Sequence, residues 1–358
     1  MRLKRLELWW RGLWIKILVR LMRHADDAQP SWDARPHRVL FLRHDRAGDM
    51  ILSTGVLAAI GKSRPTITMD VLASPANAAI LDGSGYVNDV VVFDKKKISS
   101  YLPTLMRLRR MHYDAVIDCM VTAPSVTTLL LILASGARYR VGIAGRGNDS
   151  AFNITVPPTD RPNAHMVELL APLAAPFGVG ADALRGPTLT LTQDERSRAE
   201  QSWGEITGPR ALINISAGSS ERAWPDVNYA KVMRHLRARE AGVTLRVVSA
   251  PSESARGEAI AHEGGGEYVR TPAIRDVFAL VASADFVFTP DTSIAHAASA
   301  FHTAAVVMFV RGKRERWRLY ETSGENVEHS EGTLETLPYA TVIAAVDRVW
   351  DEVAVALE

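Results

Sequence analysis

The sequence is poor in cysteine. Cys119 is the single cysteine of the 358 residues, which excludes an intramolecular disulfide and a cysteine-rich metal cluster. Its place in the strand-like run 115–119 favours a buried structural thiol over a catalytic one. The sequence also has no short-period repeat and no low-complexity tract. Together these absences are typical of a globular protein from a reducing compartment.

Dinucleotide-binding turns are missing as well. Neither candidate strand-to-helix turn contains G-x-G-x-x-G, which argues against a nicotinamide-dependent dehydrogenase. What is present is ordinary in amount, because 47% of the residues are hydrophobic and 23% are charged. A chain of 358 residues is long enough for two domains that each have a full core.

Acidic residues are nearly absent from the first 24 positions. This segment has seven Lys or Arg residues and one Glu, whereas the whole chain has a net charge of +2, so the remainder is mildly acidic. On a helix, cations lie along the flank of one apolar stripe. The stripe consists of Leu3, Leu6, Trp10, Leu13, Trp14, Ile17 and Leu21. Tryptophan beside cations is typical of helices that lie at a bilayer interface.

We therefore predict that residues 1–30 form an amphipathic helix and a linker, and that the helix binds an anionic membrane surface peripherally. A membrane span is disfavoured, because Arg11, Lys16 and Arg20 interrupt the run of about 20 apolar residues that it requires. A secretory signal peptide also fits poorly, because no small-residue cleavage site follows the apolar region. The alternative is a helix that packs on the protein's own body or on a partner.

Short β-branched segments alternate with helical segments along the rest of the chain. Strands are expected at 39–42, 68–72, 90–93, 115–119, 140–143, 211–214, 245–249, 286–289 and 304–309. This alternation predicts an α/β fold with parallel sheets that helices cover on both faces. Gly and Pro in the stretch 178–192 predict a crossing between two Rossmann-like domains, at 31–185 and 186–338. An amphipathic helix is expected at 339–358.

The segment 289–298 follows an apolar run and precedes a helical pattern of small residues. It therefore places Asp291, Thr292 and Ser293 on a turn at the carboxyl edge of a sheet. At that edge, free backbone N–H groups and the helix dipole favour a phosphate. The alternative is a plain helix N-cap, because Asp, Thr and Ser are all favoured at that position.

A second polar turn occupies residues 214–225, between a buried-strand pattern and a helix expected from about Val227 to Ala241. Small residues let the backbone approach a ligand closely, and four of them lie here: Ser216, Gly218, Ser219 and Ser220. Arg222 adds a permanently charged guanidinium suited to a diphosphate. The alternative is a Ser- and Gly-rich loop with a solvated arginine.

The third polar turn, 43–50, directly follows the strand expected at 39–42. Asp49 stands at the start of a helix, so it is either a helix cap or a carboxylate placed to take a proton from a bound hydroxyl. Arg43 and Arg46 are candidates to hold an anionic acceptor, and surface ion pairs with neighbouring Asp residues are the alternative for both.

Together, the three turns resemble glycosyltransferase family 9, the heptosyltransferase family, over residues 37–350. The matching pieces are Arg43 to Asp49 with the helix at 52–57, Ser216 to Pro225, and Pro290 to Ser293 with His296. The resemblance implies a GT-B architecture, in which two Rossmann-like domains with parallel sheets face a central cleft. It also implies inversion at the sugar carbon, a nucleotide-diphosphate sugar as donor substrate, no separate cofactor and no metal.

Residue roles follow from the same resemblance. Asp49 matches the catalytic base of the family. Arg222 stands where the family has Lys or Arg near the donor phosphates, and Glu253 stands where a family acid meets the nucleoside ribose. The donor-site signature is matched by Asp291, Thr292 and His296. A histidine that supports its own helix is the alternative for His296.

The chain departs from the family pattern in several places. Ser293 replaces a glycine, Val310 replaces the glycine that follows a strand-ending Phe, and the Trp-Gly-Pro region is reduced to residues 317–320. A Cys-rich stretch beyond that region is absent. These departures concern the donor sugar and the acceptor more than the fold.

The predicted function is an inverting glycosyltransferase at the cytoplasmic face of the inner membrane. By family, it moves heptose from ADP-heptose to a glycolipid such as the lipopolysaccharide core, with no part for nucleic acid. Two alternatives stay open. A nucleotide-sugar epimerase on the same architecture needs no acceptor and no Trp-rich leader, and a non-catalytic, membrane-associated scaffold would keep only the fold.

Overall fold

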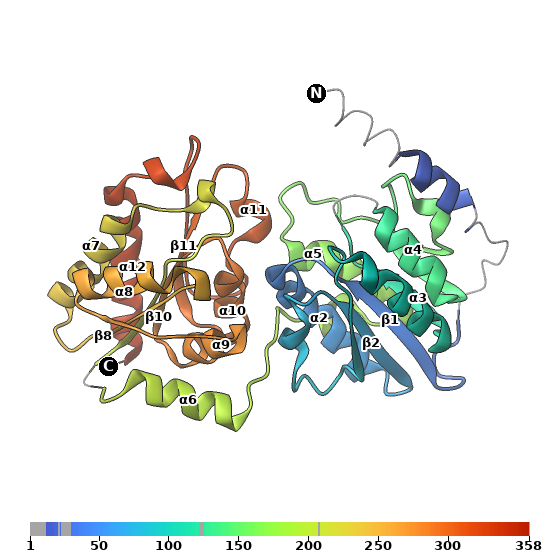
Figure 1. The fold of residues 1–358 in the computed structure, drawn as a ribbon, viewed down its shortest axis with the longest axis horizontal. Helices are drawn as coiled ribbons and strands as arrows, with labels where there is room; N and C mark the ends of the chain where they lie inside the picture. The colour runs from blue at the N-terminus through green and yellow to red at the C-terminus, as the bar shows by residue number, and fades with distance from the viewer. Residues whose placement is uncertain (1–11, 21, 23–29, 122–124, 207, 358) are drawn as a thin grey trace. The chain divides into compact units, whose positions relative to one another are not determined.

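The computed structural model describes residues 12–20, 22, 30–121, 125–206 and 208–357. Contacts within the chain divide it between Arg185 and Gly186 into two compact units, residues 1–185 (unit 1) and 186–358 (unit 2). Each unit contains a six-stranded parallel sheet with helices against it (Figure 1), so the predicted α/β fold is confirmed.

The sheet of unit 1 has the strand order β3–β2–β1–β4–β5–β6. Its strands are β1 (His37–Arg43), β2 (Ile67–Ala73), β3 (Asp89–Val92), β4 (Ala115–Asp118), β5 (Tyr139–Ile143) and β6 (Ile154–Val156). In the centre, Leu42 of β1 is in register with Leu72 of β2 on one side and with Asp118 of β4 on the other. The strand order changes direction between β1 and β4, which is where open α/β sheets bind ligands.

Two sets of helices cover the sheet of unit 1. The described elements are α2 (Ala47–Ser63), η1 (Ala78–Leu81), η2 (Ile98–Ser100), α3 (Tyr101–Arg110), α4 (Val126–Ser135), η3 (Asp149–Ala151), α5 (Met166–Leu170), η4 (Ala171–Phe177) and η5 (Ala181–Ala183), where η marks a 3-10 helix. The helix α2 packs with α5 and η4, whereas α3 packs with α4. Right-handed crossovers place these two groups on opposite faces, because the strand order runs outward from the centre in both directions.

The sheet of unit 2 repeats this plan with the order β12–β11–β10–β7–β8–β9. Its strands are β7 (Arg210–Asn214), β8 (Thr244–Val248), β9 (Glu267–Tyr268), β10 (Phe286–Pro290), β11 (Ala304–Phe309) and β12 (Gly324–Glu328). The change of direction falls between β10 and β7, where Phe288 is in register with Ile213. The predicted polar turns 214–225 and 289–298 therefore begin on neighbouring strands.

The helices of unit 2 include the C-terminal segment. The described elements are α6 (Gln193–Trp203), η6 (Ser220–Arg222), α7 (Asp226–Arg239), η7 (Pro251–Glu253), α8 (Ser254–Gly264), α9 (Ile274–Ser283), α10 (Ser293–Phe301), α11 (Arg314–Trp317), η8 (Leu334–Thr336) and α12 (Tyr339–Leu357). The amphipathic helix expected at 339–358 is α12, and it packs into the core of unit 2. There the ring of Trp350 lies 5.4 Å from the ring of Phe286.

All nine strands expected from the sequence form, but three further strands were missed: β6, β9 and β12. Each of the three is the edge of its sheet and pairs on one side only. The strands β6 and β9 have three and two residues, and β12 reads Gly-Glu-Asn-Val-Glu with Val327 as its one buried side chain. Such strands form because a neighbour offers hydrogen bonds, so they leave no apolar pattern in the sequence.

The predicted N-terminal stripe falls partly within the described residues. Residues 12–20 are helical, whereas residues 1–11, 21 and 23–29 lie outside the described residues. Leu18, Val19 and Met22 are buried in the core under α3 and α4. Trp14 and Ile17 belong to the stripe and are 50% and 39% exposed. This short helix therefore packs on its own body with one side and leaves Trp14 and Ile17 of the stripe exposed on the neighbouring side.

No helix in the described ranges, 12–20 and then 30 onward with their gaps, is long and apolar enough to cross a membrane.

The packing of the short helix predicts different outcomes for two truncations. Removal of residues 1–11 takes away none of the side chains that the described helix buries, so it is the reference truncation. Removal of residues 1–24 is expected to lower the melting temperature, because it strips Leu18, Val19 and Met22 from the core, and each such side chain contributes roughly 1.5–3 kcal/mol when fully buried. Thermal unfolding followed by circular dichroism measures both. Equal melting temperatures for the two truncations would contradict the packing.

Candidate active site

In unit 1, the turn after β1 positions Asp49. The helix α2 begins at Ala47, and Arg46 is its N-cap in an extended conformation with no side-chain cap hydrogen bond. Asp49 therefore lies inside the first turn rather than at the cap. Its carboxylate accepts a hydrogen bond from the backbone N–H of Arg46, as an acid at the third helical position does.

Arg43 holds this turn together. Its side chain is buried, and its Nε donates to the backbone oxygen of Asp49 at 3.0 Å. One terminal nitrogen, Nη1, donates to the backbone oxygen of Cys119 at 2.6 Å and lies 3.3 Å from the carboxylate of Asp45. The other, Nη2, lies 3.4 Å from Oδ1 of Asp49. Every nitrogen of the guanidinium is therefore engaged within unit 1.

The expected contact between Arg43 and an acceptor does not fit this placement. A guanidinium that is 1% exposed and surrounded by its own carboxylates and carbonyls presents no donor to a substrate. Arg43 instead orients Asp49, because it contacts both the backbone and the side chain of that residue. Arg46 is exposed on the same turn and remains the candidate for an anionic acceptor.

The pKa of the Asp49 carboxyl is raised, so its neutral form is favoured more than in an ordinary aspartate. Burial raises its pKa to about 6, the charge of Arg43 opposes the rise, and the neighbouring carboxylate of Asp45 adds to it. A carboxylate whose pKa lies close to the working pH is suited to general-base chemistry, because it is both ionised and basic.

Asp118 is a second carboxyl at this edge that the sequence reasoning missed. It ends β4 directly beside Leu42 of β1, and its Oδ1 accepts from the backbone N–H of Met120 at 2.9 Å. Burial raises the pKa of Asp118 to about 6. The sequence does show an Asp near the end of an apolar strand, but the strand expected at 115–119 included Asp118 as an ordinary strand residue.

Two further contacts, made by Asn77 and His44, hold the turn at 43–50 in place. The Nδ2 of Asn77 donates to the backbone oxygen of Arg43 at 2.9 Å, which ties the loop after β2 to the end of β1. His44 is buried, with its Nε2 3.3 Å from Oγ1 of Thr128, and burial lowers its pKa to about 4. His44 is therefore neutral at pH 7 and adds no charge beside Asp49.

In unit 2, the two predicted polar turns meet. Arg222 and Asp291 are 69 residues apart in sequence, and Nη1 of Arg222 donates to the backbone oxygen of Asp291 at 2.7 Å. The same nitrogen lies 3.1 Å from the carboxylate Oδ2 of Asp291. A Cβ on Gly218 would lie 2.8 Å from Nη2 of Arg222, so only glycine at this position lets the guanidinium approach so closely.

Asn214 connects the same two turns and was also missed. From the end of β7, its Nδ2 donates to Oγ1 of Thr289 at 2.9 Å and lies 3.3 Å from Oγ1 of Thr292. Thr292 is the N-cap of α10, with its hydroxyl accepting from the N–H of Ile294 at 3.3 Å. The capping alternative thus holds for Thr292, whereas Ser293 is the first helical residue and Asp291 precedes the cap.

The third strand end of unit 2 contributes Glu253. The hydroxyl of Ser216 donates to Oε2 of Glu253 at 2.5 Å and accepts from the N–H of Ala250 at 2.6 Å. Oε1 of Glu253 accepts from Nη1 of Arg256 at 2.7 Å. Ser216 therefore joins the loops that follow β7 and β8, and Glu253 is held at the rim of the predicted donor loop.

The remaining predicted donor residues differ in exposure. Gly218, Ser219 and Ser220 are exposed on the loop after β7, and the hydroxyl of Ser219 accepts a hydrogen bond from Nε of Arg222 at 3.4 Å. His296 is buried within α10, and its ring centroid lies 6.1 Å from that of Trp317. This surrounding favours a packing role for His296 over a phosphate contact.

The arrangement in unit 2 suits an anionic ligand. Thr292 caps the nine-residue helix α10, whose N-terminus carries a positive partial charge, and Arg222 lies at the same edge. The carboxylate of Asp291 neutralises Arg222 here, so an incoming phosphate competes with Asp291 for the guanidinium. Within the described residues, no group of three or more His, Cys, Asp or Glu side chains is arranged to hold a metal ion.

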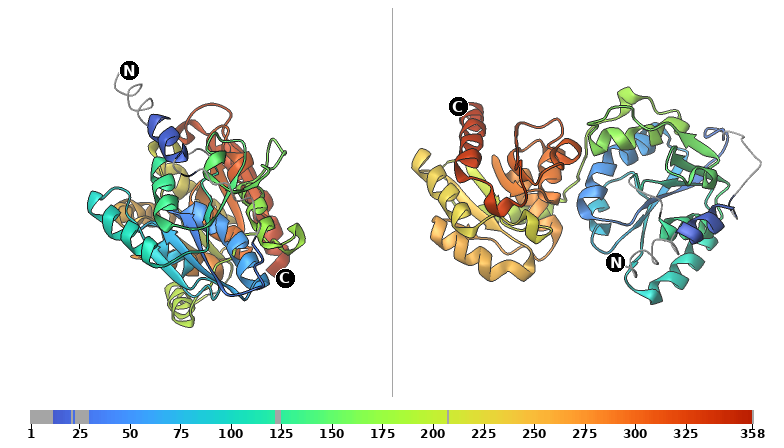
Figure 2. Two further views of the ribbon diagram at one scale, coloured as in Figure 1. Left: turned by 90° about the vertical axis from the view of Figure 1, so that its right-hand side faces the viewer. Right: turned by 90° about the horizontal axis from the view of Figure 1, so that it is seen from above.

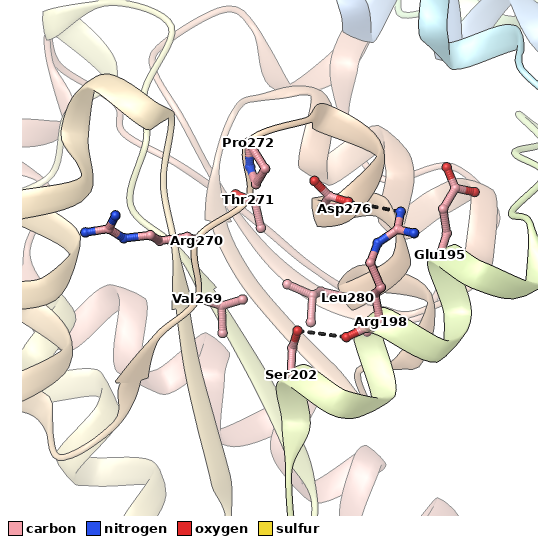
Figure 3. Close-up of a pocket in the computed structure, with 10 residues that line it drawn as sticks. Glu195, Arg198, Ser202, Val269, Arg270, Thr271, Pro272, Asp276 and Leu280 are labelled. Carbon is pink, nitrogen blue, oxygen red and sulfur yellow. Dashed lines mark hydrogen bonds and ion pairs between the residues drawn. The ribbon is translucent and has the colours of Figure 1, made fainter.

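Unit 2 also has a pocket of about 180 Å³ between α6 and the loop that follows β9 (Figure 3). None of the predicted site residues lines it. Its cations are already paired, because Arg198 lies 3.4 Å from Asp276 and Arg270 lies 3.2 Å from Glu258. The pocket is therefore not part of the predicted donor site.

Comparisons with known proteins agree with the fold. The chain is 23% identical to lipopolysaccharide heptosyltransferase 3 of Escherichia coli, over 84% of this chain and 96% of that protein. Among solved structures, a glycosyltransferase family 9 protein from Veillonella parvula matches with a TM-score of 0.78 at 15% identity, over 91% of this chain and 100% of that one. The E. coli heptosyltransferase WaaC with ADP matches with a TM-score of 0.67 at 17% identity, over 87% and 99%.

A family model matches a large part of the chain. The model described as glycosyltransferase family 9 (heptosyltransferase) covers residues 104–343, which amount to more than half of the sequence. The matched range contains the turns at 214–225 and 289–298 but not the turn at 43–50. The chain belongs to glycosyltransferase family 9.

Proposed function

We propose that the protein is an inverting heptosyltransferase that moves heptose from ADP-heptose to a lipid-linked acceptor such as the lipopolysaccharide core. The similarity to a lipopolysaccharide heptosyltransferase supports heptose and the acceptor, and the match to a heptosyltransferase solved with ADP supports the nucleotide. The observation that carries the chemistry is Asp49, a carboxylate held by Arg43 at the change of strand direction, with its pKa raised to about 6.

The proposed reaction is a direct displacement. The acceptor hydroxyl loses its proton to the carboxylate of Asp49 while its oxygen attacks the anomeric carbon of the donor sugar. The bond between that carbon and the diphosphate oxygen breaks, and its electron pair leaves with the nucleoside diphosphate. Attack from the face opposite the leaving group inverts the anomeric carbon. The contact with Arg43 keeps Asp49 oriented throughout.

The donor half of the reaction is assigned to unit 2. The N-terminus of α10, the exposed hydroxyls of Ser219 and Ser220, and Arg222 stabilise the charge that gathers on the leaving diphosphate. Glu253, held by Ser216 at the rim of the loop, is assigned to the ribose hydroxyls. Losing one preorganised donor to the leaving group costs roughly 2.7–4 kcal/mol of barrier if it acts as an oxyanion contact does.

A peripheral location at the cytoplasmic face of the inner membrane belongs to the same proposal. A lipid-linked acceptor is confined to the membrane, so the enzyme gains from binding there. The support is the cationic N-terminal segment 1–24 and the exposure of Trp14 and Ile17 on its described part.

The chemistry is tested by Asp49→Asn. The amide keeps the shape and the hydrogen bond from Arg46 but lacks basicity, so kcat is expected to fall roughly 10²–10⁴-fold with ADP affinity retained. Release of ADP in the presence of donor and acceptor measures kcat, and calorimetry measures ADP affinity. The matched control is Asp45→Asn, which removes the other carboxylate beside Arg43 and is expected to lose far less activity.

Near wild-type kcat for Asp49→Asn would leave Asp49 only the structural role of accepting from the N–H of Arg46 at the start of α2, and would move the base elsewhere. Turnover of the donor without any acceptor would instead favour the epimerase alternative.

The raised pKa predicts an acid limb in the pH profile. Below pH 6 the Asp49 carboxyl is mostly protonated and is no longer a base, so kcat/KM is expected to fall as pH drops through about 6. An unperturbed aspartate would hold activity down to about pH 4. Asp118→Asn removes the other carboxyl that titrates in this range. The variant is expected to keep the acid limb, because the limb is attributed to protonation of Asp49. A limb that disappears in Asp118→Asn would transfer the titration to Asp118.

The donor site is tested by Arg222→Ala. Loss of a charge-assisted contact to a phosphate is expected to weaken ADP binding by roughly 1.5–3 kcal/mol, measured by calorimetry. Asp291→Ala removes a competitor for the guanidinium but also the carboxylate contact that orients it; we expect the loss of orientation to dominate, so ADP binding weakens as well. Arg198→Ala, which removes an exposed arginine paired with Asp276 in the same unit, is the control. Turnover should not respond to a chelator. Unchanged ADP affinity in both donor-site variants would return these residues to structural roles.

A further inference from the structure

Large apolar side chains are exposed on one part of unit 1. All those that are exposed within the described residues of unit 1 come from the helix at 12–20, the stretch from β3 to α3, and α4: Trp14, Ile17, Val92, Ile98, Leu102, Met106 and Leu133. Ile98 and Leu102 are 89% and 66% exposed. Single exposed apolar residues are ordinary, but a concentration of them on one face marks an interaction surface.

The three α-helices among these elements, at 12–20, α3 and α4, lie side by side. The side chains of the helix at 12–20, of α3 and of α4 share one buried core. Figures 1 and 2 show the blue helix at 12–20 beside α4, with α3 on the other side of α4. Helices that cover one face of a sheet bury their inner sides, so their exposed sides point outward together. We call this surface the helical face, defined by Trp14, Ile17, Ile98, Leu102, Met106 and Leu133.

Cations surround the apolar residues of the helical face. Residues 94–111 contain six Lys or Arg residues and one acidic residue, Asp94, and the stretches 12–20 and 126–138 contain no acidic residue. Lys95, Lys96 and Lys97 are exposed immediately before Ile98. Asp94 lies 3.7 Å from Lys97 and so neutralises only one of the three lysines. The helical face is therefore both apolar and positively charged.

The helical face reaches the edge of the sheet that carries Asp49. The stretch 93–100 follows β3, and β3 runs parallel to β2 and β1, so it leaves the sheet at the same carboxyl edge as the turn 43–50. The ring of Phe93 lies 5.8 Å from that of His44, and the charge of Lys95 contributes to the lowered pKa of His44. An acceptor held at this surface would therefore be close to the turn that positions Asp49.

We propose that the helical face, with Lys95, Lys96 and Lys97, is a docking surface for an anionic lipid bilayer. The mixture identifies a bilayer: exposed aliphatic side chains and Trp14 enter the interface, while the surrounding lysines and arginines meet anionic headgroups. The surface thus extends beyond the N-terminal segment and includes η2 and α3. The delivery of a lipid-linked acceptor to Asp49 rests on the proposed function, whereas the binding to lipid does not.

Co-sedimentation of the full chain with vesicles tests the surface without donor or acceptor. Wild-type protein is expected to bind phosphatidylglycerol-containing vesicles, to bind them less at high salt, and to bind pure phosphatidylcholine vesicles weakly. The variant Ile98→Asn/Leu102→Asn is expected to bind roughly tenfold more weakly, because it removes two side chains that enter the interface. Both positions are exposed, so its melting temperature should be unchanged.

The matched control is Val355→Asn/Leu357→Asn, which removes two exposed aliphatic side chains from α12 in unit 2 and is expected to bind as wild type does. Removal of residues 1–11 is expected to weaken binding without abolishing it, since α3 and the helix at 12–20 remain. Unchanged vesicle binding by Ile98→Asn/Leu102→Asn overturns the proposal, as does a wild-type protein that self-associates through these residues and ignores vesicles.

Failure of the docking surface and failure of the proposed function give different results. With a soluble, delipidated acceptor, Ile98→Asn/Leu102→Asn is expected to transfer sugar at the wild-type rate, because neither residue lies at the Asp49 turn. Vesicle binding that is lost in this variant, with no sugar transfer by any form of the protein, would support the surface and contradict the heptosyltransferase. Sugar transfer by the protein, with vesicle binding unchanged in Ile98→Asn/Leu102→Asn, would support the heptosyltransferase and contradict the surface.

Discussion

The organisation of unit 1 depends on one buried charge. Arg43 ends the central strand β1, is 1% exposed, and is therefore costly to bury unless its guanidinium is fully paired. Its partners come from three places: the carboxylates of Asp45 and Asp49, the backbone of α2, and the carbonyl of Cys119 after β4. Satisfying one arginine thus fixes the turn, the start of α2 and the neighbouring strand end together. The orientation of Asp49 is a consequence of this pairing.

Unit 2 applies the same principle at its own change of strand direction. Asn214 at the end of β7 hydrogen-bonds hydroxyls of the β10 turn, and Arg222 from the β7 loop pairs with Asp291 on that turn. Neighbouring parallel strands end at one edge, so polar groups that follow them in sequence meet in space. Arg222 differs from Arg43 in that it is less deeply buried and lies beside the N-terminus of α10. It is therefore placed to exchange a carboxylate for a phosphate, whereas Arg43 is not.

The outer surface of unit 1 keeps several large apolar side chains exposed to solvent. The helix at 12–20 uses Leu18, Val19 and Met22 to complete the core, which leaves Trp14 and Ile17 outside. The aliphatic side chains of η2 and α3 are exposed on the same face although burial would stabilise the fold. A surface that keeps apolar groups in water beside a run of lysines fits the proposed partner, because an anionic bilayer has both an apolar interior and a negative surface. A family whose relatives include a lipopolysaccharide heptosyltransferase makes such a partner chemically coherent.

The sequence by itself determined the α/β class, nine of the strands, the extent of α12 and the family, because apolar periodicity and strand-end turns are local patterns. It also identified Asp49, Arg222 and Asp291 as polar residues at strand ends. Tertiary structure alone decided that Arg43 is a buried positioning group and that the short N-terminal helix packs on its own core. It also decided that Asp118 ends beside Leu42 in unit 1 and that Asn214 hydrogen-bonds the β10 turn in unit 2. The edge strands β6, β9 and β12 were likewise decided by their neighbours. The physical reason is common to all of these: pairing, burial and the tuning of a pKa depend on which residues meet across the sheet, and that information is absent from any one segment.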